Sequence, residues 1–229
     1  MTFEPLCIGI KRAEFRANDA NAKQADSAFE ALRETALKKS AYRCLRCGYE
    51  STEDKLRRKH SVLHVHHQDN DHHNNEPQNH VPHCSLDHAY HHIGCDAPTP
   101  GGAKGWASQM RIAFAPELSP EDLNHVQRAI GAALSDAKER EIATEILDLL
   151  SVLSLPVRDV FGTNKAKEFA ACFSSMSDVE YQERVERADG LRVLFHPDIL
   201  KLSGSEMLSD APLFPVKSWV GVANGFGNS

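Results

Sequence analysis

Two cysteines separated by two residues, Cys44 and Cys47, have the spacing at which two thiolates bind one metal ion. Gly48 follows the pair, and a glycine there permits the positive-φ turn that brings backbone amides toward the sulfurs. A redox Cys-x-x-Cys motif is the alternative, but such motifs accompany a βαβ pattern that this segment lacks. A histidine-rich segment follows instead. We therefore favour a zinc site, of which this pair is one half.

The second half of the zinc site is predicted at Cys84, in the run HCSLDH. Asp87 stands three residues after Cys84, where a fourth cysteine would complete a four-thiolate site. A carboxylate oxygen also binds Zn²⁺, at about 2.0 to 2.2 Å. His83 and Cys95 are alternative fourth ligands, and a weak or empty site is a further alternative because each lost thiolate lowers the affinity. The predicted ligands of a structural Zn²⁺ are thus Cys44, Cys47, Cys84 and Asp87.

Histidines are concentrated between the two halves of this site. Eleven of the thirteen lie between His60 and His92. Alternation of apolar residues with histidine from Leu63 to His66 predicts a short strand, and the polar stretch after it predicts a loop. The residues after Cys84 predict a helix that places His88 on one face with His91 or His92.

This order of strand, loop and helix resembles the HNH, or ββα-metal, nuclease fold over about residues 41–95. The resemblance implies that His67 is the general base and that Asn79 orients it. It also implies that His66 and His88 hold a second divalent cation on the scissile phosphate if the enzyme is active, with His91 or His92 as a further ligand.

Charge argues against nuclease activity. The formal net charge is -6, and no lysine or arginine occurs between Lys59 and Lys104. Neutralisation of phosphates supplies most of the affinity of DNA-binding modules. We therefore expect nucleic acid not to be a partner. We favour an HNH-like fold that has lost its catalytic activity. A metal-dependent HNH DNA endonuclease is the alternative.

The predicted fold class is α+β, an HNH-like zinc module followed by a mainly helical region. The segment APTPGGAKG has the composition of a linker. The predicted divisions are an N-terminal strand and helix over 1–40, the module over 41–96, the linker over 97–105, the helical region over 106–200 and an irregular tail over 201–229.

Helix boundaries in the second region are marked by local signals. Ser119 followed by Pro120 predicts a helix start, and the sequence from Ser177 fits a capping box. Pro156 is predicted to end a helix. The apolar faces of 123–134 and 142–153 are expected to be buried against neighbouring elements, because amphipathic helices in a region of this size bury one another.

Five motifs together resemble the IcmJ family, also called DotN, of the Dot/Icm type IVB secretion system. They are SAFEALR at 27–33, YRCLRCG at 42–48, HHQDND at 66–71, HAYHHIG at 88–94 and PELSPEDLN at 116–124. The family pattern has a cysteine where this chain has Asp87. The resemblance implies an HNH-like zinc fold followed by a helical region.

The resemblance also implies a role. The chain would be a cytoplasmic subunit of the coupling protein complex, associated with the inner-membrane secretion machinery. Its partners would be the C-terminal extension of the coupling ATPase, DotL, and the other subunits of that complex. The chain has no run of about 18 apolar residues and no signal peptide at its start, so we expect a cytoplasmic protein without direct membrane insertion.

Overall fold

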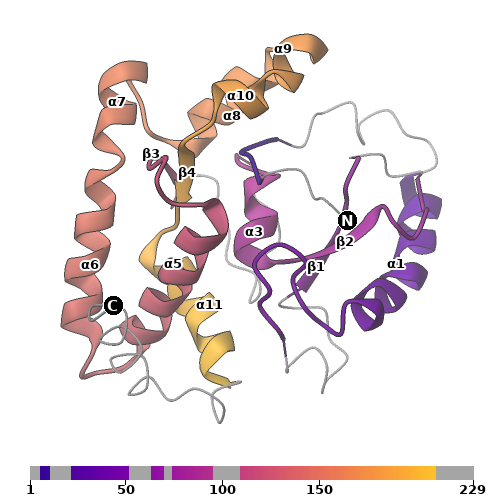
Figure 1. Cartoon of the computed structure of the whole chain (residues 1–229), viewed down its shortest axis with the longest axis horizontal. Coiled ribbons are helices and arrows are strands. Elements are labelled where there is room, and N and C mark those ends of the chain that lie inside the picture. Colours follow the sequence, from indigo (N-terminus) through magenta and orange to yellow (C-terminus); the bar gives the residue numbers. More distant parts are fainter. Residues whose placement is uncertain (1–5, 11–21, 52–62, 70–73, 95–108, 210–229) are drawn as a thin grey trace.

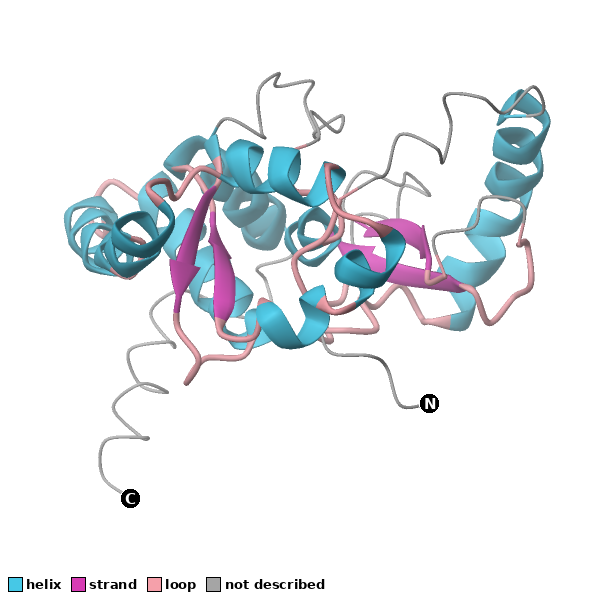
Figure 2. Ribbon diagram, turned by 90° about the horizontal axis from the view of Figure 1, so that it is seen from above, coloured by secondary structure: helices cyan, strands magenta, loops and turns pink. Residues whose placement is uncertain are grey.

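The computed structural model describes residues 6–10, 22–51, 63–69, 74–94 and 109–209, and the account below concerns these residues. Figure 1 shows their arrangement along the chain. They form a mixed α and β structure with two small antiparallel sheets, each a single pair of strands (Figure 2). The predicted α+β class is thus confirmed at this level. The predicted linker over 97–105 lies outside the described residues.

The first sheet is a hairpin flanked by helices. Strand β1 (Leu63–His67) pairs with β2 (His80–Cys84), so that Leu63 lies opposite Cys84 and His67 opposite His80. Helix α1 (Ala22–Lys39) contacts both strands from one side, and the short helix α3 (Ser85–Tyr90) contacts them from the other (Figure 1). The strand near residue 63 and the helix after Cys84 occur where the sequence predicts them.

The N-terminal segment forms no regular strand over residues 6–10. Its Gly9 nitrogen donates to the carbonyl of Tyr90 at 2.7 Å, and the Ile93 nitrogen donates to the carbonyl of Gly9 at 2.9 Å. Residues 6–10 are therefore hydrogen-bonded to the end of α3 and do not form the predicted strand, while residues 1–5 and 11–21 lie outside the described ones.

The second region contains a strand pair that the sequence analysis did not anticipate. Strand β3 (Arg111–Phe114) pairs with β4 (Leu191–Leu194), which lies about 80 residues later in the chain. The helices of this region are α5 (Pro120–Ser135), α6 (Arg140–Val152), α7 (Leu155–Phe161), α8 (Ala166–Ser174), α9 (Asp178–Gln182), α10 (Arg184–Arg187) and α11 (Pro197–Ser209).

Two of the predicted helix starts are confirmed and one predicted stop is wrong. Ser119 caps α5, where its hydroxyl oxygen accepts from the Asp122 nitrogen at 3.0 Å, and Ser177 forms the predicted capping box with Glu180. Pro156 does not end α6, which already stops at Val152. It lies in the first turn of α7, where a proline needs no backbone donor. The predicted tail also begins too early, because α11 continues to Ser209.

Helix α5 joins the two regions. It contacts α3 on one side and α6, α11 and β4 on the others. Leu86 and Tyr90 from α3 share one hydrophobic core with Ile112 of β3 and Ile130 of α5. The Val193 nitrogen of β4 donates to the hydroxyl of Tyr90 at 3.0 Å. The predicted module over 41–96 and the helical region therefore share a common core among the described residues.

The contact between α5 and α11 depends on two glycines. A Cβ atom at Gly131 would lie 1.9 Å from the Leu200 carbonyl oxygen, and one at Gly204 would lie 2.1 Å from the Ala132 nitrogen. Since real Cβ atoms do not approach backbone this closely, the two helix backbones meet only because both positions lack a side chain.

The apolar face of α6 is not buried as predicted. Ile142, Ile146 and Leu149 are 56%, 40% and 71% exposed, whereas Ala143 is buried. Leu150 is only partly buried, where it packs on the core. The helix thus turns a different part of its surface toward α5 than the apolar spacing predicts. Among the described helices, moreover, none combines the length and apolar character that crossing a membrane requires.

Candidate metal centre

The four predicted zinc ligands lie together. One ligand atom from each of Cys44, Cys47, Cys84 and Asp87 lies within 4.8 Å of the other three. The Cys44 Sγ is 3.0 Å from the Asp87 Oδ2, and the Cys47 Sγ is 3.7 Å from the Cys84 Sγ. With Zn–S bonds of about 2.3 Å, two sulfurs of a tetrahedral site are about 3.8 Å apart. The side chains therefore fit a metal ion of the size and geometry of Zn²⁺.

A tight turn positions the first two ligands. The Gly48 nitrogen donates to the Cys44 carbonyl at 3.0 Å, and Gly48 has the positive φ, 75°, that the sequence analysis expects of it. The Cys44 nitrogen donates to the Tyr49 carbonyl at 2.8 Å. The Leu45 nitrogen donates to the Pro82 carbonyl of β2 at 2.9 Å, which fixes the turn against the hairpin that carries Cys84.

The ligand side chains of this cluster are buried, and their acidic groups crowd one another. Cys44 and Cys84 are 1% exposed and Asp87 is fully buried. Burial and, after it, the neighbouring Cys84 raise the pKa of Asp87 to about 7, and burial lifts the pKa of Cys44 well above its usual value. Hydrogen bonds from Cys44 and Cys84 lower the pKa of Cys47 to about 5. Protonation thus relieves the crowding of negative charge, and a bound Zn²⁺ would relieve it instead.

Helix α5 supplies the partners that surround the ligands. The Arg128 Nη2 donates to the Cys84 Sγ at 2.8 Å, and the Asn124 Nδ2 donates to the Asp87 Oδ1 at 2.7 Å. The Arg128 guanidinium also lies 4.4 Å above the Tyr49 ring. Such outer partners orient ligands and adjust the affinity of a metal site.

Asn124 is itself fixed in the core. It is within hydrogen-bonding distance of Gln127, whose Nε2 donates to the Val193 carbonyl at 3.0 Å and whose Oε1 accepts from the Phe195 nitrogen at 2.9 Å. The sequence analysis missed these residues. The signal that could have revealed them is a set of polar residues at helical spacing, 124, 127 and 128, between the apolar residues of α5.

A second cluster consists of histidines. One ring nitrogen from each of His66, His88 and His92 lies within 4.8 Å of the other two. Burial lowers the pKa of His66 and of His88 well below the usual value, so both rings are neutral, which is the form that binds metal ions. Among the described residues the buried Nε2 of His66 has no hydrogen-bond partner. These three rings form a second candidate metal site. Of the two histidines considered as its further ligand, His91 and His92, it is His92 that lies with the other two.

His83 does not join the cysteine cluster. Its ring stacks against those of His66 and His91, with centroids 5.5 Å and 5.0 Å away. Successive residues of a strand point to opposite faces, so Cys84 and His83 face different clusters. Of the two alternative fourth zinc ligands, His83 is therefore excluded by its position, and Cys95 lies outside the described residues.

Of the residues with implied nuclease roles, His66 and His88 belong to this second cluster, whereas His67 and Asn79 do not. The His67 ring lies 4.5 Å from the Phe29 ring of α1 and 5.0 Å from the His80 ring, and His67 is only 5% exposed. The Asn79 Nδ2 donates to the Asp69 Oδ1 at 2.9 Å and to the Asn74 carbonyl at 2.8 Å. These hydrogen bonds close the loop between β1 and β2 and do not hold His67.

The burial of His67 determines how much folding stability its removal should cost. A relic of a catalytic site beside a polar loop would be partly exposed, and its loss would then have little effect. Because His67 instead packs against Phe29, we expect His67→Ala to destabilise the fold by roughly 1 to 3 kcal/mol. Urea unfolding followed by circular dichroism measures this, with Lys167→Ala, at an exposed position of α8, as the control. A change below about 0.5 kcal/mol would contradict the packing described here.

Comparison with known proteins assigns no family: no family model matches the chain, and no curated protein matches it. The functional argument therefore depends on the motifs and on the geometry of the two clusters.

Proposed function

We propose that this chain is a zinc-binding scaffold or adaptor subunit of a type IVB secretion coupling complex. In this proposal it is a cytoplasmic protein attached to the inner-membrane complex, and it binds the C-terminal extension of a DotL-like coupling ATPase. The identity of the complex comes from the resemblance of five motifs to the IcmJ family. The structural observation that carries a binding role is the exposed apolar face of α6.

The exposed face of α6 has the form of a protein-binding surface. Ile142, Ile146 and Leu149 follow one another at spacings of four and three residues, so they form a continuous stripe. Exposed acidic residues, Glu141, Glu145 and Asp148, lie along one edge of this stripe. An apolar stripe with a charged edge is typical of surfaces that bind a partner helix or extended segment.

The cysteine cluster is suited to a structural role in such a subunit. In our proposal Zn²⁺ binds four protein side chains that leave no open position for substrate, as in structural zinc sites. The hairpin followed directly by a helix, β1, β2 and α3, supports an HNH-like fold for the module. The hydrogen bonds from α5 to Cys84 and Asp87 then attach the helical region to the metal site.

Binding of the ATPase extension tests this function. We expect the purified zinc-loaded protein to bind a peptide of that extension in calorimetry. Leu149→Glu, at an exposed position where folding is unaffected, should weaken the binding by roughly tenfold. Thr144→Glu, on the opposite exposed face of α6, is the matched control. No binding by the wild-type protein would contradict the proposed function.

The alternative function is a metal-dependent HNH DNA endonuclease. The grouping of His66, His88 and His92 favours it, because three neutral imidazoles can hold one divalent cation. Against it stand the burial of His67 and the loop-closing role of Asn79. We expect no nicking of supercoiled plasmid with Mg²⁺ or Mn²⁺. Nicking that is lost in a folded His66→Ala variant would establish the nuclease instead.

A further inference from the structure

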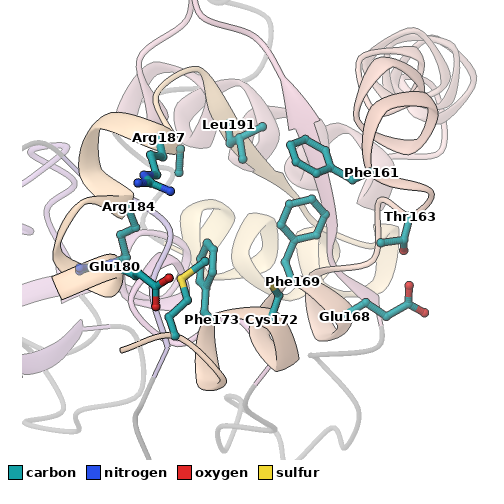
Figure 3. A pocket seen from close by; sticks show the side chains of 12 residues that line it. Phe161, Thr163, Glu168, Phe169, Cys172, Phe173, Glu180, Arg184, Arg187 and Leu191 are labelled. Carbon is teal, nitrogen blue, oxygen red and sulfur yellow. The ribbon is translucent and has the colours of Figure 1, made fainter. Parts of the chain in front are cut away.

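A pocket in the helical region lies outside both clusters. It encloses about 300 Å³ and is formed by the end of α7, by α8, α9 and α10, and by the start of β4 (Figure 3). Its walls are apolar, with Phe169 and Phe173 on the floor and Leu191 facing them. The ring of Phe161 lies 5.3 Å from that of Phe169 and is 58% exposed, so one wall of the pocket opens to solvent.

Charged residues stand at the edges of this pocket, and the acidic ones already have partners. Glu180 accepts hydrogen bonds from the Ser177 nitrogen and hydroxyl at 2.8 Å and 2.7 Å, in the capping box of α9. Glu168 pairs with Lys165 at 3.2 Å. Both carboxylates thus already have a hydrogen-bond or ion-pair partner within the protein.

The positive charges of Arg184 and Arg187, at the edge of the same pocket, are less completely neutralised by the protein. Arg184 stacks on the Tyr181 ring at 4.0 Å and donates to the Tyr181 carbonyl, and no carboxylate pairs with it among the described residues. Among the described residues Arg187 forms an ion pair with Glu183, in an exposed pair whose side chains are 69% and 46% accessible, and its positive charge also acts on Glu180. Exposed pairs of this kind contribute little, and a guanidinium has five donors. The pocket edge can therefore accept a further carboxylate.

We propose that this pocket is the docking site for a segment of a partner protein that presents an apolar side chain next to a carboxylate. The apolar side chain enters between Phe161, Phe169 and Phe173, and the carboxylate pairs with Arg187. The open wall at Phe161 favours a partner segment over a small ligand, since small-ligand pockets bury most of the ligand surface. The proposal rests on the interaction role proposed above and identifies a second surface, whose edge carries arginines as well as glutamates, unlike the acidic edge of α6.

Cys172 gives a direct readout of the pocket. It is an exposed thiol on the pocket wall, so a docked segment should shield it from N-ethylmaleimide. The probes are two short helical peptides that carry leucine and phenylalanine four residues apart and differ only in whether glutamates or lysines flank them. We expect the glutamate peptide to slow alkylation of Cys172 in the full-length protein by roughly tenfold, and the lysine peptide to have little effect.

An exposed charge variant tests the role of Arg187. Arg187→Gln should abolish the preference for the glutamate peptide, whereas Arg158→Gln, an exposed arginine of α7 outside the pocket, should leave it unchanged. Equal protection by both peptides, or protection by neither, would overturn the proposal, as would protection by decanoate alone.

The experiment separates this proposal from the proposed function. If the wild-type protein binds the ATPase extension but the glutamate peptide leaves Cys172 reactive, only the pocket proposal fails. If the glutamate peptide protects Cys172 but the extension does not bind, only the assignment to the coupling complex fails.

Discussion

Replacing Cys44 by alanine is expected to abolish tight zinc binding and to unfold the module around β1, β2 and α3. Structural zinc contributes about 10 to 16 kcal/mol of apparent binding free energy in small zinc-dependent folds, which exceeds the stability of most domains. The hairpin and α3 contribute buried apolar residues such as Leu63, Leu86 and Tyr90, but without a cation this core would enclose the buried thiols and the carboxylate of the site uncompensated. Elemental analysis and thermal unfolding of wild-type and variant proteins measure the effect.

Cys172→Ala is the matched control for this substitution, because Cys172 is exposed and lies in α8. It should keep one equivalent of zinc and the wild-type melting temperature. The destabilisation by Cys44→Ala should also extend beyond the module, since Arg128 and Asn124 of α5 would face a disordered site. Absence of zinc from the wild-type protein, together with unchanged melting of Cys44→Ala, would show that the cysteine cluster is not a metal centre.

Acidification should destabilise the protein through its buried histidines. Burial lowers the pKa of His66 and His83 well below the usual value, and it lowers the pKa of the neighbouring His64 to about 4. An unfolded histidine takes up a proton near pH 6.5, which the folded state resists. Stability is therefore fully present above about pH 6.5 and is lost as the pH falls from there toward about 4.

Each such histidine contributes a slope of about 1.4 kcal/mol per pH unit, so His66 and His83 together contribute about 3 kcal/mol per unit. Urea unfolding at pH 7 and at pH 5.5 measures this. His83→Leu should flatten the slope, because neither ring nitrogen of His83 has a hydrogen-bond partner among the described residues. Equal slopes for the variant and the wild type would show that His83 is protonated in the folded state.

The local chemistry of the site could be predicted from the sequence because it depends on short spacings. Two residues separate Cys44 from Cys47, and two separate Cys84 from Asp87, so the ligand atoms of each pair lie close together once a turn and a helix start form. The short strand before His67 and the N-cap at Ser119 were predictable for the same reason, since the deciding residues are neighbours.

The contacts across the chain could not be predicted in this way. The pairing of β3 with β4 and the contact of Arg128 with Cys84 join residues that are distant in the sequence, and no local pattern encodes them. For α6, the apolar spacing predicted an amphipathic helix correctly, but not which part of its surface α5 would cover. Asn79 likewise follows the expected order of the HNH pattern, whereas its hydrogen bonds depend on the folded loop.

The close crossing of α5 and α11 affects where mutations can inactivate the metal centre. Gly131 lies one turn from Arg128 and Gln127 on the same helix, and Gly131 and Gly204 have no space for even a methyl group. Alanine at either position would push α5 away from α11 and so shift the side chains that hold Cys84 and Asp87. Loss-of-metal alleles should therefore map to this helix crossing as well as to the ligands, although neither glycine touches the ion.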